Sequence, residues 1–216
     1  MLWLLVFLFA VIVAAGLTVY FWPSIGKWLE QRNLEQILKN FREAGCLIER
    51  NLVLAGTYLD YLIVAPAGVF IVKKCTFRKE NTYLIGKETA RVWYYYEPYK
   101  INPEISAEQI IQGAVVDNAN RIPLPNPILE CERVIKTLTS SITFSGRSLK
   151  FYPIVLLVPR IKGINLERIK NSTAKVIFPD LLEDIILDLD QQQIPVQELE
   201  KVKDKIINSA GVRRAG

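Results

Sequence analysis

Hydrophobic residues form an unbroken run at the start of the chain, where none of the first 22 side chains is charged. As an α-helix rising ~1.5 Å per residue, residues 1–22 would extend about 33 Å and cross the ~30 Å hydrocarbon core of a bilayer. Trp3 near one end and Trp22 at the other suit the two membrane interfaces. The run predicts a transmembrane helix, and the proline and glycine within residues 23–26 predict a break after it.

A cleaved signal peptide is the alternative interpretation of residues 1–22, because the small residues at 14–16 would permit cleavage. No lysine or arginine precedes the run, however, and the run is long for the hydrophobic part of a signal peptide. We therefore expect an uncleaved, single-pass membrane anchor. The first basic side chains, Lys27 and Arg32, follow the run. The positive-inside rule therefore puts the C-terminal domain in the cytoplasm.

Two further apolar runs, residues 59–65 and 69–72, are separated by a Pro-Ala-Gly turn. Neither run alternates apolar with polar residues, which is typical of strands covered on both faces in the centre of an α/β sheet. The turn residues predict that the two strands form a hairpin.

Charged residues stand only at the open end of this hairpin, with Asp60 on the first strand and Lys73 and Lys74 on the second. A two-residue turn would place Asp60 opposite Lys73, and a three-residue turn would place it opposite Lys74. A carboxylate that faces amines at the rim of a buried sheet is either a structural ion pair or part of a reaction centre.

The other elements follow from helical stripes and short apolar runs. We expect helices at residues 27–43, 102–120, 128–139, 180–189 and 196–208, a proline-rich turn at 122–127, and strands at 46–54, 82–85, 91–96, 151–158 and 174–178. This order predicts an α/β fold with a mixed central sheet flanked by helices, in one domain at residues 27–189. A C-terminal helix and a frayed basic tail, which contains Arg213 and Arg214, would occupy residues 190–216.

Composition excludes several kinds of chemistry. The chain has no histidine, which removes Ser-His and Cys-His catalysis and imidazole metal sites. Its three cysteines, Cys46, Cys75 and Cys131, form no CxxC pair, so a zinc site or a disulfide framework is not expected. A net charge of +5 permits an anionic partner, either nucleic acid or lipid headgroups.

The hairpin resembles that of the nuclease-related domain (NERD) family, whose pattern is G-x-x-x-D-H-x-x-V-x-P-x-G-V-F-V-I-E-x-K. Gly56, Asp60 and the sequence PAGVFIV at residues 66–72 carry the resemblance. It extends to the helix before the hairpin, to Trp93 and the Asn-Pro pair at 102–103 after it, and to the later segment YPIVLLV. The family is similar to the restriction-endonuclease-like PD-(D/E)xK nucleases. The resemblance therefore implies a restriction-endonuclease-like fold over most of residues 27–189.

The resemblance also implies a site that hydrolyses phosphodiesters with Mg²⁺. In such sites an aspartate and a glutamate hold the ion, and a lysine two residues beyond the glutamate assists the attacking water. Carried over to this chain, the aspartate and metal ligand is Asp60. The glutamate position holds Lys73, the lysine position holds Cys75, and the family's histidine is Tyr61.

These departures predict an inactive site. An ammonium at Lys73 would pair with Asp60 in place of a metal and would repel a divalent ion by roughly several kcal/mol at an effective dielectric of about 20. Cys75 is an uncharged thiol at neutral pH unless its pKa is lowered. We therefore expect a degenerate nuclease that needs no cofactor and that holds nucleic acid or another protein.

An active Mg²⁺-dependent nuclease with a rearranged site is the alternative. It would use Asp60, the family's helical glutamate and Lys74 as the catalytic lysine. The helical glutamate is Glu30 or Glu35, and the sequence does not choose between them. Lys74 points to the opposite strand face from its neighbour, however, because successive side chains alternate along a strand.

DNA or RNA is the expected partner if the basic side chains in and after the hairpin form a cationic patch. The candidates are Lys73, Lys74, Arg78, Lys79, Lys87 and Arg91. A solvated rim is the alternative interpretation of these residues. The aromatic residues at 93–96 either stack on bases or pack as ordinary strand residues.

Overall fold

The computed structural model describes residues 26, 28–54, 56–78, 82–96, 121–142, 149–161, 163–167, 174–187, 189, 194–209 and 213–214, together with 3, 7 and 11. Apart from residues 3, 7, 11 and 26, the predicted anchor and the break after it lie outside this part of the chain, as do the predicted helix at 102–120 and Lys79. Within the described residues, no helix combines the length and the apolar character needed to cross a bilayer.

The described residues form two sheets, the first of which has six strands in the order β10-β1-β2-β3-β7-β9. Their bounds are β1 Leu47–Leu54, β2 Thr57–Ala65, β3 Gly68–Thr76, β7 Phe151–Val158, β9 Lys175–Ile177 and β10 Arg213–Arg214. The pairs β1–β2 and β2–β3 are antiparallel, whereas β3–β7 and β7–β9 are parallel. The prediction of a mixed central sheet is therefore confirmed.

The basic tail differs from its prediction as a frayed end. Arg213 and Arg214 form β10, which pairs antiparallel with Val53 and Leu52 of β1. The edge of β1 offers unpaired backbone groups that a further strand satisfies. Sequence composition around the two arginines gives no sign of this pairing, because the hydrogen bonds come from the backbone.

The central hairpin turns through Pro66 and Ala67, with Ala65 paired to Gly68. Gly68 has a φ of 145°, and a Cβ atom there would stand 2.8 Å from the Tyr152 ring and 2.9 Å from the carbonyl oxygen of Lys150. Only glycine fits this close approach of β7 to the turn. The turn is thus built for a sheet whose next strand passes directly beside it.

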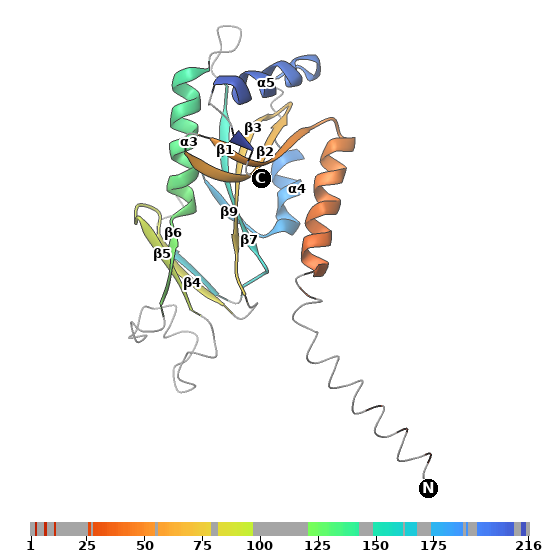
Figure 1. Ribbon diagram of the computed structural model, residues 1–216, viewed down its shortest axis with the longest axis vertical. Coiled ribbons are helices and arrows are strands. Elements are labelled where there is room, and N and C mark those ends of the chain that lie inside the picture. Colours follow the sequence, from red (N-terminus) through yellow and green to blue (C-terminus); the bar gives the residue numbers. More distant parts are fainter. Residues whose placement is uncertain are drawn as a thin grey trace.

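Helices cover both faces of the first sheet (Figure 1). The helix at residues 28–43, orange in the figure, and α4 (Leu182–Leu187) pack on one face. α3 (Pro127–Ser141) and α5 (Leu199–Ser209) pack on the other face. Short 3-10 turns at Pro179–Leu181 and Val196–Glu198 precede α4 and α5. This two-sided cover explains why the strands read as continuous apolar runs, and it confirms the predicted α/β class.

A second sheet has the strand order β6-β5-β4-β8. Its strands are β4 Tyr83–Lys87, β5 Val92–Tyr96, β6 Ile122–Pro125 and β8 Gly163–Glu167. β6 corrects the prediction of a simple turn at 122–127, and β8 was not predicted. Prolines are tolerated in β6 because it lies at the edge of the sheet. Trp93 is fully buried between this sheet and the first one, in a cluster that includes Cys75 and Val155.

Asn126 joins the second sheet to the start of α3. Its side chain is 2 % exposed, and its Nδ2 donates to the carbonyl oxygens of Glu88 at 2.8 Å and Ala90 at 2.7 Å, with a longer contact of 3.4 Å to that of Lys87. Its Oδ1 accepts the backbone N–H of Ile128 at 3.0 Å and so caps the helix. One amide therefore serves as helix cap and as the anchor of the β4–β5 turn.

Replacing Asn126 separates these two roles. Asn126→Ala loses the cap and leaves buried carbonyls without a donor, so we expect the free energy of unfolding to fall by about 2–4 kcal/mol. Asn126→Asp keeps an acceptor for Ile128 but sets a carboxylate against the carbonyl oxygens of Glu88 and Ala90. Urea unfolding followed by circular dichroism should therefore show Asn126→Asp to be at least as unstable as Asn126→Ala at neutral pH. Wild-type stability of the aspartate variant would contradict the role given to the amide.

Candidate functional site

Asp60 lies where the central hairpin stops pairing. The backbone pairs of β2 and β3 run from Ala65 and Gly68 to Tyr61 and Val72. Beyond them, the backbone N–H of Lys74 donates to Oδ2 of Asp60 at 2.7 Å. The carboxylate thus takes the place that a β2 carbonyl would occupy in a continuing ladder, and it is 9 % exposed.

The neighbouring strand is irregular at the same level. Asn51 of β1 has a φ of 54°, and it lies between the pairs Arg50–Tyr61 and Leu52–Leu59, opposite Asp60. Asparagine tolerates this left-handed conformation better than most residues do. Its Oδ1 accepts a hydrogen bond from the Tyr58 hydroxyl at 2.7 Å. Asp60 therefore belongs to a local break in two adjacent strands.

Lys73 does not pair with Asp60 through a short contact, which corrects the prediction from the sequence. Its Nζ lies 3.0 Å from Oε2 of Glu130, in the first turn of α3, and it donates to the carbonyl oxygen of Tyr58 at 2.8 Å. The same ammonium lies 5.3 Å from the centre of the Tyr58 ring. Glu130 offers the nearer partner because α3 packs directly over β3.

Burial raises the pKa of Asp60 above its ordinary value of 3.8. The backbone hydrogen bond from Lys74 and the charges of Lys74 and Lys73 act in the opposite direction, but they are the smaller effects. A carboxylate removed from water without a full counter-charge favours its protonated form. Burial therefore destabilises the ionised form of Asp60 relative to an exposed aspartate.

Cys75 is fully enclosed in the cluster between the two sheets. Burial raises the pKa of its thiol to about 12, so the side chain is neutral at physiological pH. Cys131 of α3 behaves in the same way, with a pKa of about 12 and its Sγ 3.8 Å from the carbonyl oxygen of Ile71. Neither thiol supplies a cation or a nucleophile.

The two candidate helical glutamates are held by other partners. Glu35 forms a two-pronged ion pair with Arg50 of β1, with distances of 2.9 and 2.7 Å. The same guanidinium lies over the Tyr61 ring at 5.8 Å. Glu30 accepts the backbone N–H of Arg160 at 3.1 Å, at the end of β7. Each glutamate thus has a hydrogen-bonding partner of its own, Arg50 for Glu35 and the Arg160 backbone for Glu30.

Comparison with known proteins identifies the relationship. The family model of the nuclease-related domain matches residues 25–158, which is more than half of the chain. The chain belongs to the nuclease-related domain family. No curated protein and no solved structure matches it.

The family's divalent metal does not fit the residues found here. Among the described residues, no three histidine, cysteine, aspartate or glutamate side chains gather as a metal would require. The nuclease-related aspartate, Asp60, accepts a backbone N–H, and the ammonium of Lys73 holds Glu130. A hard cation needs several oxygen ligands directed at one point, and a fixed ammonium beside them opposes it.

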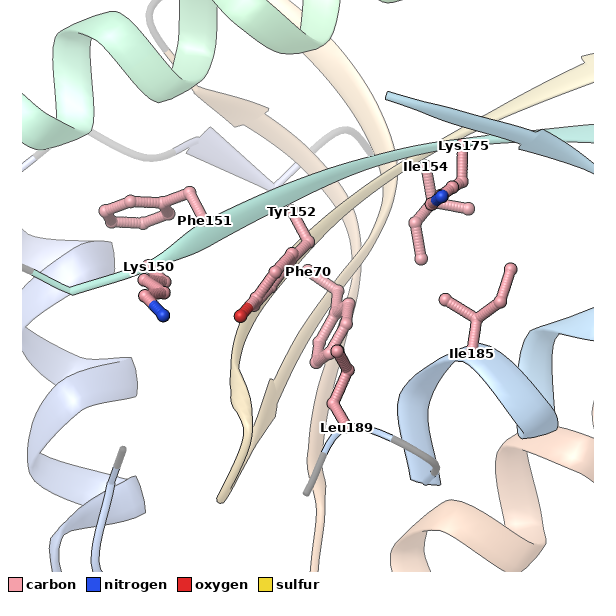
Figure 2. A pocket seen from close by; sticks show the side chains of 8 residues that line it. All are labelled: Phe70, Lys150, Phe151, Tyr152, Ile154, Lys175, Ile185 and Leu189. Carbon is pink, nitrogen blue, oxygen red and sulfur yellow. The ribbon is translucent and has the colours of Figure 1, made fainter. Parts of the chain in front are cut away.

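A pocket of about 410 Å³ lies away from this site, between β7 and α4 (Figure 2). Figure 2 shows a mostly apolar lining with one lysine toward each end. Its lining residues are Phe70, Lys150, Phe151, Tyr152, Ile154, Lys175, Ile185 and Leu189. Phe70 is close to the turn of the hairpin, whereas Asp60 is at its open end. None of the described lining residues carries a carboxylate, so the described part of the pocket is separate from Asp60.

The basic residues of the predicted cationic patch differ in their exposure to solvent. Arg78, Lys87 and Arg91 are exposed, whereas Lys73 and Lys74 are partly buried. Sequence reasoning missed Arg121, whose guanidinium lies 5.7 Å from the centre of the half-exposed Tyr94 ring on the second sheet. It also missed Glu130, because an acidic residue in the first turn of a helix is ordinary and carries no separate signal.

The raised pKa of Asp60 predicts a pH dependence of stability. A folded-state pKa above the unfolded value means that this carboxyl stabilises the fold fully below about pH 3.8 and loses that contribution as the pH rises through the folded pKa. Asp60→Asn still accepts from the Lys74 N–H but does not titrate. Relative to the wild type, its free energy of unfolding should therefore rise as the pH increases from acid to neutral.

Urea unfolding at a series of pH values measures this difference. Asp184→Asn, at an exposed position of α4, controls for the general effect of removing one negative charge. A constant difference between Asp60→Asn and the wild type across the acid range would contradict the role assigned to burial.

Proposed function

We propose that this chain is a membrane-anchored nuclease-related domain that binds nucleic acid without cleaving it. The main support for a non-catalytic site is the position of Lys73, which occupies the family's glutamate position. Its ammonium contacts both Glu130 and the Tyr58 carbonyl oxygen. The ion pair is largely shielded, with 18 % of the Lys73 side chain and 26 % of the Glu130 side chain exposed. A built-in monovalent cation thus stands where the family would bind a divalent one.

A metal ion at this site would have to displace the Lys73 ammonium from Glu130. A divalent ion near Asp60 would repel the Lys73 ammonium by roughly several kcal/mol at an effective dielectric of about 20. Moving the ammonium away would leave Glu130 partly buried without its partner, which is also costly. Cys75, at the family's lysine position, is neutral and enclosed. The Lys73–Glu130 ion pair is therefore expected to be more favourable at this site than a bound divalent metal ion.

An active nuclease with a rearranged site lacks comparable support. It needs a second carboxylate beside Asp60, but Glu35 is held by Arg50, and Glu30 accepts from the Arg160 backbone. Lys74 donates its backbone N–H to Asp60, and its charge lowers the pKa of that carboxyl, but this does not supply the missing second carboxylate. Cleavage of plasmid, single-stranded DNA or RNA by the wild type but not by Asp60→Asn, with Mg²⁺ or Mn²⁺, would nevertheless overturn the non-catalytic proposal.

The variant Lys73→Glu tests whether the Lys73 ammonium excludes a divalent metal ion from the site. This change would set a third carboxylate beside Glu130 and Asp60, so we expect an unstable protein that divalent ions stabilise. At a metal concentration about 100 times the dissociation constant, binding would add about 2.7 kcal/mol to the free energy of unfolding. Thermal unfolding with increasing Mn²⁺ should show a rising midpoint for Lys73→Glu and an unchanged midpoint for the wild type.

Lys73→Gln is the matched control, because it removes the ammonium without adding a carboxylate. It should be destabilised and remain insensitive to Mn²⁺. An equal response of the wild type to Mn²⁺ would show that the ammonium does not exclude a metal.

Nucleic-acid binding is supported by the exposed face of the second sheet. Tyr94 is 37 % exposed with Arg121 over its ring, and Arg91 directly precedes the strand that carries Tyr94. An aromatic ring beside guanidinium groups suits a base stacked on the ring and phosphates paired with the cations. The net charge of +5 favours approach of a polyanion.

Filter binding to single-stranded DNA across a range of salt concentrations tests this face. The affinity should fall with salt, and Arg91→Gln with Arg121→Gln should lower the slope by about 0.7 for each phosphate that the arginines neutralise. Tyr94→Ala should weaken binding by about 1–3 kcal/mol with little change in slope. Lys39→Gln with Lys201→Gln removes the same charge from other helices and should leave the affinity near that of the wild type. Salt-independent or absent binding by the wild type would leave a protein as the partner.

Membrane anchoring through residues 1–22 completes the proposal. Its support is the uncharged composition of this segment and the exposure of Trp3, Phe7 and Val11, which are helical and spaced by four residues. Large apolar side chains at this spacing lie on one side of a helix. Basic residues only after the segment favour a single pass with the nuclease-related domain in the cytoplasm.

A further inference from the structure

Two large apolar side chains at the start of the helix at residues 28–43 have no place in the core. Trp28 is 57 % exposed and Leu29 is 52 % exposed, whereas Leu34 and Leu38 farther along the same helix are fully buried. The helix therefore begins by turning apolar surface outward, before its inner face meets the first sheet. Isolated exposed apolar residues are common, but an exposed tryptophan next to a leucine needs a partner.

Polar contacts connect this helix start to a neighbouring part of the surface. Glu30 accepts the backbone N–H of Arg160 at 3.1 Å, which ties the first helical turn to the end of β7. The Arg160 guanidinium lies 5.0 Å from the centre of the Phe178 ring and 3.9 Å from Oδ2 of Asp180. Leu181, directly after Asp180, is 43 % exposed. Arg160 thus lies between the first helical turn and Asp180, the residue before Leu181.

We call this surface the basal face and define it by Trp28, Leu29, Arg32, Arg160 and Leu181. Figure 1 shows the helix at residues 28–43 beside α4, which follows Leu181. Arg32 lies over the Trp28 ring at 5.2 Å, and the Arg160 side chain is 69 % exposed. Three apolar side chains are therefore accompanied by two guanidinium groups.

We propose that the basal face rests in the headgroup layer of an anionic bilayer. The proposal builds on the membrane anchor proposed above and adds a second, peripheral contact to it. Trp28 follows Trp22, the end of the uncharged segment, by only six positions, so the two lie within about 20 Å even in an extended chain. A bilayer that holds the anchor would hold the basal face close to its surface.

The chemistry of the basal face fits lipid better than it fits another protein domain. Tryptophan partitions to the interface, where its ring meets acyl chains and its N–H meets water and headgroups. Arginine side chains lay their apolar stems along such a surface and pair with lipid phosphates. The consequence is that the domain would hold one orientation on the membrane instead of swinging on a free tether.

Quenching of Trp28 fluorescence in the full chain tests the contact. Replacing Trp3 and Trp22 with phenylalanine leaves Trp28 and Trp93, and Trp93 is fully buried in the domain. The protein is reconstituted into vesicles of phosphatidylcholine with a minor share of phosphatidylglycerol, some of it brominated near the headgroup. We expect brominated lipid to remove most of the Trp28 emission and aqueous acrylamide to have little effect on it. The same protein with Trp28→Phe supplies the Trp93 signal to subtract.

The possible outcomes distinguish failure of the basal contact from failure of the membrane anchor. Vesicle flotation with Trp28 open to acrylamide and insensitive to bromine would overturn the basal contact and leave the anchor intact. Failure of the wild-type chain to float with vesicles would overturn the anchor and the basal contact together.

The dependence on lipid charge gives a second readout. The blue shift of Trp28 emission should increase when phosphatidylglycerol is added to pure phosphatidylcholine vesicles. Arg32→Gln with Arg160→Gln should lose this increase, whereas Lys39→Gln with Arg42→Gln, on the exposed side of the same helix, should keep it. An equal loss in both double variants would show that net charge alone, not the basal face, responds to the lipid.

Discussion

The hydrogen bond from the Lys74 backbone to the Asp60 carboxylate marks the point on which the site depends. It ends the antiparallel ladder of the hairpin and leaves β3 to continue alongside β7 as far as Thr76. Because side chains alternate along β3, Lys73 and Cys75 then face α3 and the second sheet. The Asp60 carboxylate therefore has a structural task in this chain, as the partner of a backbone donor.

The substitutions at the family's glutamate and lysine positions support one another. Lys73 forms an ion pair with Glu130, so the Glu130 carboxylate has a cationic partner without a metal. Cys75 is enclosed with Trp93 and Val155 between the two sheets, where a lysine would lose its hydration and its charge. A small neutral thiol suits that dry environment, whereas the catalytic lysine of the family would not. The two positions thus hold an ion pair with α3 and a buried core residue.

The hairpin and the fold class could be predicted from the sequence because strands that are buried on both faces appear as continuous apolar runs. The partner of Lys73 could not be predicted, since Glu130 is far away in the chain and acidic residues are common in the first turn of a helix. β8 is a short edge strand with mixed polarity, and β6 contains two prolines, so neither has the pattern of a buried strand. The pairing of Arg213 and Arg214 with β1 uses backbone groups, which no side-chain pattern reveals.

The proposed binding surfaces are compatible with each other in space. Figure 1 shows the second sheet and the helix at residues 28–43 on opposite sides of the first sheet. The two proposed binding surfaces therefore lie on different elements, with Tyr94 on β5 and Trp28 on the helix at residues 28–43. Anchoring also confines the domain to a thin layer at the membrane, and confinement raises the effective concentration for any partner held there. Under the proposed function, even a weak affinity for nucleic acid would then retain it at the membrane, and a non-cleaving domain would leave it intact.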